Sequence, residues 1–137
     1  MAATVADMLA KSAALLTPVT ETPRLEAEML LAHALNMSRA SLLARLQESV
    51  DAPDFKVLLT RRLAYEPLAY IFGEWEFFGL SMLVTPPLLT PRPETEHLVE
   101  RALNFLARQE ASAVLVDACC GTGSVGVAIA HNAPGHS

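Results

Sequence analysis

Residues 113–130 read AVLVDACCGTGSVGVAIA, and this stretch decides the fold. Residues 113–118 form a short apolar run that ends in an acid, which is typical of a strand buried on both faces of a parallel sheet. A tight glycine loop at residues 119–123 comes next, and small and apolar residues from Ser124 onward predict a helix. Strand, glycine loop and helix in this order predict the opening of an α/β nucleotide-binding domain.

The glycines Gly121, Gly123 and Gly126 match the pattern G-x-G-x-x-G after a strand and before a helix, the context that this pattern requires. Glycine lets the backbone turn sharply, and the helix N-terminus offers free N–H groups to a ligand. The pattern alone fits nicotinamide and flavin dinucleotides nearly as well as S-adenosylmethionine. Asp117 favours S-adenosylmethionine, because a carboxylate repels a pyrophosphate and tolerates an ammonium and a sulfonium. The alternative is that Asp117 is a surface acid that caps a structural turn.

Residues 74–92 predict a β-hairpin and a proline-rich linker. Aromatic residues at 75–78 and apolar residues at 82–84 flank a possible turn at 79–81. The prolines stiffen an extended connector, because proline fixes its own φ and biases the preceding residue away from helix. After Pro93 an apolar stripe at helical spacing predicts a helix, and its members are Leu98, Val99, Ala102, Leu103 and Leu106.

Residues 1–73 predict a bundle of short amphipathic helices. Pro23 is expected at the first position of one helix with Thr22 as its N-cap, and Ser38 is expected to cap the next. Pro53 is expected to open a further helix, which Glu66-Pro67 then breaks. The expected inward-facing residues of these last two helices are Leu42, Leu43 and Leu46, and then Phe55, Leu58, Leu59 and Leu63. Helices this short are stable only when their apolar faces pack on one another.

The composition of the 137 residues argues against several classes of protein. Hydrophobic residues make up 52% and charged residues 18%, so a packed core is expected. The net charge of -5 argues against a nucleic-acid surface, and no apolar run reaches the length of a membrane span. The adjacent Cys119 and Cys120 suit neither a disulfide nor a zinc site, and the four histidines lack ligand spacing. We therefore expect a cytoplasmic protein with reduced thiols and no metal.

Four blocks of the chain resemble the release factor glutamine methyltransferases, the PrmC or HemK family. They are PRLEAEMLLAH at 23–33, RR at 61–62 with EPLAYIFG at 66–73, WEFFGL at 75–80, and LLTPRPETE at 88–96. The likeness runs in unbroken order from about residue 20 to residue 131. The block at 88–96 is far more diagnostic than the glycine loop.

The resemblance implies an α/β multidomain protein. Its parts would be a helical bundle at 1–73 that docks a peptide-chain release factor, a hairpin and linker at 74–92, and the start of a class I, Rossmann-like methyltransferase domain at 93–137. The implied activity is transfer of a methyl group from S-adenosylmethionine to the glutamine side chain in the Gly-Gly-Gln motif of the release factor. A monomer is implied for the full-length protein, without membrane or direct nucleic-acid contact.

The resemblance implies a cofactor site when the family's positions are carried over to this chain. A loop of five residues would line the methionine end of S-adenosylmethionine, and Asp117 would precede this loop as its acidic partner. The five are Cys119, Cys120, Gly121, Thr122 and Gly123. The family usually has glycine and a small residue where this chain has the two cysteines. If φ is positive at Cys119, its Cβ costs roughly 1 kcal/mol.

The chain ends at Ser137, before an acid that would hold the ribose hydroxyls and before the Asn-Pro-Pro-Tyr motif of the family. We therefore assign no catalytic residue and expect the methyltransferase domain to be truncated and inactive in this chain. Without a second strand beside it, the strand at 113–118 leaves residues 112–137 mobile, self-associating or covered by another polypeptide. Two further functions stay open: a non-catalytic module that binds release factors, and a fragment of a nicotinamide-dependent oxidoreductase.

Overall fold

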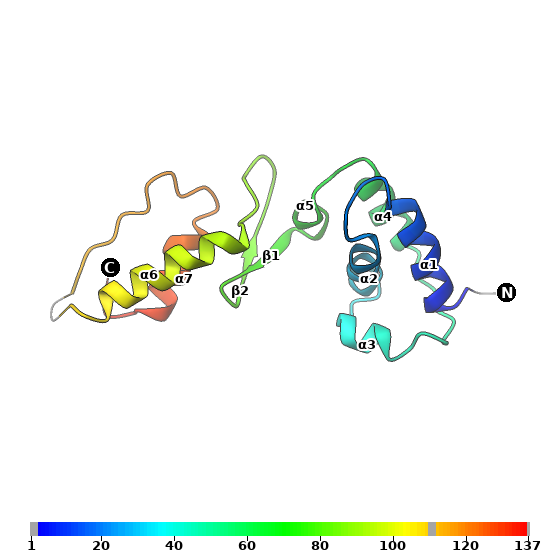
Figure 1. Ribbon diagram of the computed structural model, residues 1–137, viewed down its shortest axis with the longest axis horizontal. Helices are drawn as coiled ribbons and strands as arrows, with labels where there is room; N and C mark the ends of the chain where they lie inside the picture. The colour runs from blue at the N-terminus through cyan, green and yellow to red at the C-terminus, as the bar shows by residue number, and fades with distance from the viewer. Residues whose placement is uncertain (1–2, 110–111, 137) are drawn as a thin grey trace. The chain divides into compact units, whose positions relative to one another are not determined.

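The computed structural model describes residues 3–109 and 112–136, which fall into two compact units, one up to Ile71 and one from Phe72 onward (Figure 1). The first unit is helical, as predicted. Its helices are α1 (Val5–Leu16), α2 (Pro23–Ala34), α3 (Arg39–Leu43), α4 (Phe55–Leu63) and α5 (Leu68–Phe72), whose last residue already belongs to the second unit. Helix α2 contacts α1, α3 and α4, and so forms the centre of the bundle.

Local caps fix where these helices begin. Thr4 and Asp7 form a reciprocal capping box at the start of α1. Pro23 is the first residue of α2, as predicted, although the side chain of Thr22 makes no capping hydrogen bond. Ser38 caps α3 as predicted, by accepting a hydrogen bond from the backbone N–H of Ser41. Caps and prolines act within a single turn, so the sequence predicts correctly where α2 and α3 begin.

Two details of the predicted bundle are wrong. Helix α3 ends at Leu43, so Leu46 lies outside it. In α4 only Phe55 and Leu59 are fully buried, whereas Leu58 and Leu63 are half-buried. The buried stripe of α4 is therefore narrower than its apolar pattern suggests.

Glu26 of α2 and Arg62 of α4 form an ion pair inside the first unit. Their side chains are only 12% and 13% exposed, and Arg62 Nε donates to Glu26 Oε2 over 2.6 Å. The terminal nitrogens of Arg62 are also used, on Glu26 Oε1 and on the carbonyl oxygen of Glu66. Two buried charges are tolerated because each satisfies the other and the remaining donors have acceptors.

Arg61 holds the short helix α5. Its terminal nitrogens donate to the carbonyl oxygens of Tyr70 and Ile71, which lie at the C-terminal end of that helix. The same guanidinium donates to both carboxylate oxygens of Glu66. These hydrogen bonds, helped by the positive charge of Arg61, hold the pKa of Glu66 below its ordinary value of 4.5.

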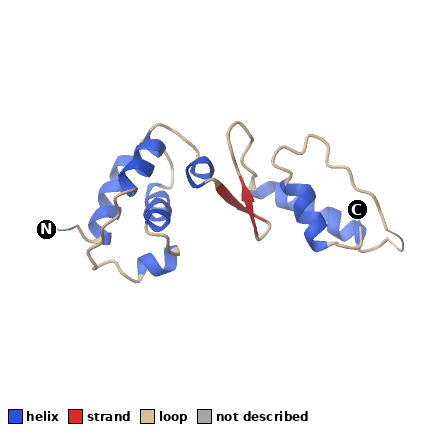
Figure 2. Ribbon diagram, turned by 180° about the vertical axis from the view of Figure 1, so that it is seen from behind, coloured by secondary structure: helices blue, strands red, loops and turns tan. Residues whose placement is uncertain are grey.

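The second unit begins with the predicted hairpin, in which strand β1 (Glu74–Phe77) pairs antiparallel with β2 (Leu80–Leu83) (Figure 2). Phe77 is paired with Leu80, so the loop has two residues, Phe78 and Gly79. Both have positive φ, 52° and 73°, as in the primed turns that suit the strand twist. The turn therefore lies one residue earlier than predicted. The N–H of Phe78 donates to Glu96 Oε1 over 2.9 Å.

Helix α6 (Glu96–Leu106) comes after the short 3-10 turn η1 (Pro93–Thr95), and helix α7 (Ser124–Asn132) packs on α6. Both helices were predicted. The core of this unit consists of Phe77, Met82, Val99, Leu106, Ala128 and Ile129. Leu98 was predicted to face inward and is exposed instead, because the buried stripe of α6 is narrower than the apolar pattern suggests.

Residues 112–117 form no strand, contrary to prediction. Val114 and Val116 are 82% and 83% exposed, while Ala113 and Leu115 between them are half-buried against the core. A strand needs a hydrogen-bonded neighbour, and the described part of the chain places none beside this segment. Buried and exposed residues alternate along this segment, so one of its faces packs on the core of the second unit. The prediction had both faces buried.

We predict that Arg62→Leu lowers the free energy of unfolding by about 3 kcal/mol, because the buried Glu26 carboxylate loses its partner. The double variant Glu26→Leu/Arg62→Leu should recover most of this loss, since no unpaired charge remains. Chemical denaturation measures both. The exposed Lys56→Leu serves as control and should change the free energy by less than about 0.5 kcal/mol. A double variant as unstable as Arg62→Leu would contradict the expectation.

The lowered pKa of Glu66 gives stability that is present above the unfolded-state pKa and lost as pH falls through the lower folded-state pKa. Glu66→Gln should therefore flatten the loss of stability as pH falls below 4.5. At neutral pH the same variant should be less stable by up to about 1 kcal/mol, since the pair is partly exposed. Thermal unfolding measured between neutral and acid pH detects both effects. An unchanged acid slope would refute the assignment to this pair.

Candidate functional site

The predicted cofactor loop lies between an irregular segment and α7. Gly121 and Gly123 have φ of 56° and 73°, a left-handed conformation that glycine adopts without steric cost. The N–H of Gly123 donates to the carbonyl oxygen of Cys120 over 2.8 Å, which closes the turn directly before Ser124 begins the helix. The sharp turn expected from the glycines is therefore present.

Asp117 lies against the first turn of α7. Its Oδ2 accepts a hydrogen bond from the N–H of Gly126 over 3.0 Å. A Cβ at Gly126 would lie 3.2 Å from that oxygen, so the third glycine of the pattern allows the close approach. A carboxylate is favoured here also because the positive end of the helix dipole faces it.

The two cysteines extend from the loop into solvent as free thiols. Cys119 has φ of 60°, so the positive φ considered at this position is present. Cys120 has no such conformation. Left-handed backbone is costly for a residue with a Cβ, and the strain is therefore concentrated at the first cysteine.

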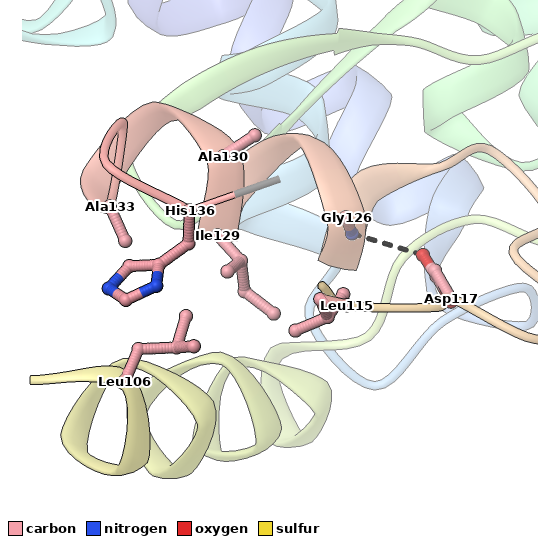
Figure 3. Close-up of a pocket in the computed structure, with 8 residues that line it drawn as sticks. All are labelled: Leu106, Leu115, Asp117, Gly126, Ile129, Ala130, Ala133 and His136. Atoms are coloured by element: carbon pink, nitrogen blue, oxygen red, sulfur yellow. Dashed lines mark hydrogen bonds between the residues drawn. The ribbon is translucent and has the colours of Figure 1, made fainter. Parts of the chain in front are cut away.

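A partly open pocket of about 200 Å³ lies beside Asp117, bordered by α6, α7 and the segment before the loop (Figure 3). Its walls are mainly apolar and come from Leu106, Leu115, Ile129, Ala130 and Ala133. Asp117 and His136 lie at its two ends, with the apolar side chains between them. The loop residues 119–123 do not line it, so the structure brings Asp117 and Gly126 together and leaves the cysteines outside.

Sequence analysis missed His136. Its Nδ1 accepts a hydrogen bond from the N–H of Ala113 over 3.0 Å, which ties the residues after α7 to the start of the irregular segment. An accepting Nδ1 leaves Nε2 as the protonated nitrogen of the neutral ring. No sequence signal marks this contact, because the partners are 23 residues apart and one of them is a backbone group. Within residues 3–109 and 112–136, no three metal-ligating side chains gather at one place.

The electrostatics of this site are simple. Asp117 brings one carboxylate next to a backbone turn rich in glycine, and no arginine or lysine lines the adjoining pocket. Such a site suits a cation or a neutral hydrogen-bonding group better than a phosphate. None of the helices in the described residues is both long enough and apolar enough to cross a membrane.

Comparison with known proteins gives consistent matches. Residues 7–73 match the family model of the PrmC N-terminal domain. The chain is 46% identical over 112 residues to the release factor glutamine methyltransferase of Nitratidesulfovibrio vulgaris, a match that covers 80% of this chain and 37% of that protein. The proteins of the same name from Coxiella burnetii and Bordetella pertussis are each 45% identical, over 87% and 82% of this chain and 44% and 42% of their own length.

The chain thus spans about two fifths of the length of these curated relatives. Each match covers at least four fifths of the chain, so it extends beyond the helical unit into the second unit. The resemblance expected from the four sequence blocks is therefore confirmed. The chain thus carries a match to the PrmC N-terminal domain over residues 7–73 and is similar to the N-terminal portion of release factor glutamine methyltransferases.

Proposed function

We propose that this chain is part of an S-adenosylmethionine-dependent methyltransferase that modifies the glutamine of the Gly-Gly-Gln motif in peptide-chain release factors. In this reaction the methyl group passes from the sulfonium to the side-chain amide nitrogen, a proton leaves that nitrogen, and S-adenosylhomocysteine remains. The proposal concerns the whole protein, because the chain covers only about two fifths of the relatives that bear this name. A cytoplasmic location accompanies this function.

The observation that carries the cofactor part of the proposal is the carboxylate of Asp117 against the first turn of α7. Its Oδ2 is fixed by the N–H of Gly126. No other hydrogen bond to Asp117 occurs among the described residues, so Oδ1 stays available for a cationic ligand. An ammonium or sulfonium close to this oxygen gains electrostatic energy, whereas a pyrophosphate at the same place is repelled. This supports S-adenosylmethionine over a dinucleotide.

The loop itself would receive the methionine end of the cofactor. Cys119, Cys120 and Gly121 are exposed, and Thr122 and Gly123 are half-buried. The loop is therefore accessible to a ligand, and it lies next to a helix N-terminus at which the N-cap residue Gly123 makes no side-chain cap. Free N–H groups there are donors for the cofactor carboxylate.

The helical first unit would dock the release factor. This part of the proposal is supported by the match of residues 7–73 to the PrmC N-terminal domain and by the names of the relatives. The beginning of the Rossmann-like domain would lie in the second unit, where an added strand would pair with residues 112–117 and restore a sheet. In that setting the exposed Val114 and Val116 would become buried.

We predict that the chain binds S-adenosylmethionine and that Asp117→Asn weakens this binding about tenfold, because the charge is lost while the hydrogen bond from Gly126 is kept. Isothermal titration calorimetry with S-adenosylmethionine and with NAD measures both ligands. Asp54→Asn, an exposed acid before α4 that makes no side-chain cap, is the matched control and should leave the affinity unchanged. NAD bound as tightly as S-adenosylmethionine would overturn the proposal.

The strain at Cys119 leads to a separate prediction. Cys119→Gly should raise the free energy of unfolding by about 1 kcal/mol, because glycine adopts the observed φ without a Cβ penalty. Cys120→Ala, in the same loop without positive φ, is the control and should change stability by less than about 0.5 kcal/mol. A destabilised Cys119→Gly would show that the thiol makes a compensating contact.

A further inference from the structure

One carboxylate in the first unit holds two arginines at once. Glu28 of α2 has a side chain only 10% exposed, and its two oxygens have different partners. Arg24 Nε donates to Oε1 over 2.8 Å, and Arg39 Nε, from α3, donates to Oε2 over 3.0 Å. The two arginine side chains are about half exposed, at 48% and 53%. One buried negative charge therefore positions two partly exposed positive charges.

The terminal nitrogens distinguish these arginines from the other paired arginines of the unit. Arg61 and Arg62 use both terminal nitrogens on backbone carbonyls or on a carboxylate, so their donors are occupied. Arg24 and Arg39 use only Nε, and their terminal nitrogens make no hydrogen bond to any described residue. Because a guanidinium carries five N–H donors, about four remain on each of these two.

Both arginines line an open hollow of about 370 Å³ beside the start of α2. The other residues around it include Pro23 and Leu25, which give it apolar surface, and Glu21. Arg24, Arg39 and Glu28 together carry one net positive charge, and Glu21 adds a negative charge at the same hollow. The four charged groups at the hollow therefore cancel, and what attracts an anion is the set of free N–H donors on the two guanidiniums. An anion with one charge meets less repulsion from Glu21 and from the chain's net charge of -5 than a polyanion does.

We propose that Arg24 and Arg39 form a binding site for a carboxylate side chain of a protein partner. A planar guanidinium presents two parallel donors that match a carboxylate, and Glu28 holds both groups in place before the ligand arrives. The apolar surface of Pro23 and Leu25 contacts the side chains next to that carboxylate. The partner is a segment of the release factor with one exposed carboxylate side chain, an assignment that rests on the proposed function.

The first test uses the chain itself and an acetylated, amidated peptide in which one glutamate is flanked by glycines. Titration monitored by the side-chain Nε–Hε signals of arginine should shift those of Arg24 and Arg39. Arg24→Gln and Arg39→Gln should each weaken peptide binding about fivefold to tenfold, because each removes one fork while Glu28 keeps the other arginine. Arg45→Gln, an exposed arginine for which no side-chain contact is described, is the matched control and should change the affinity less than about twofold. Unchanged melting temperatures show that the variants are folded.

Two results would overturn the site. Peptide binding that is equal in wild type and in both glutamine variants would leave the arginines a purely structural role. Binding of inorganic phosphate or of a single-stranded oligonucleotide at these residues, as tight as that of the peptide, would assign the site to phosphates. Arg39→Lys adds a further readout: it keeps the charge but loses the fork, so it should bind the peptide more weakly than wild type.

A second arm titrates a purified release factor into the same variants. Weaker release-factor binding by Arg24→Gln and Arg39→Gln supports both the site and its partner. Release-factor binding that these changes leave intact rejects this site while the proposed function stands. Peptide binding without any release-factor binding keeps the carboxylate site and rejects the docking part of the proposed function.

Discussion

A carboxylate removed from water must find donors inside the protein, and this constraint organises both units of the chain. In the first unit Glu26 and Glu28, two positions apart on α2, connect that helix to α4 and to α3 through arginines. In the second unit Asp117 accepts from the first turn of α7. Among the described residues no fully buried side-chain polar atom lacks a partner, so the carboxylates position their elements at little cost.

Much of the fold was predictable because its signals are local. Pro23 and Ser38 fix helix starts within one turn, and the aromatic and apolar runs on either side of Gly79 predict a hairpin with only a shift of one residue. The strand predicted at 113–118 does not form, because a strand depends on a distant partner segment and not on a local signal. Its apolar run is suitable, but a strand exists only with a hydrogen-bonded neighbour, which a local pattern cannot supply.

The local geometry of the candidate site was only partly predictable. The glycine loop and the positive φ at Cys119 follow from the local pattern and from a departure from the family. The contact of Asp117 with Gly126 gives the third glycine a specific reason that the pattern alone did not state. His136 and the two arginines on Glu28 could not be predicted, because they depend on how distant elements pack.

The hydrogen bond from the N–H of Phe78 to Glu96 fastens the two ends of a stretch that contains β2 and the proline-rich connector, across a separation of 18 residues. The connector is thus a closed loop whose anchoring does not depend on its length. The hairpin turn and the first residue of α6 are therefore held side by side, and the prolines between them bridge a fixed gap.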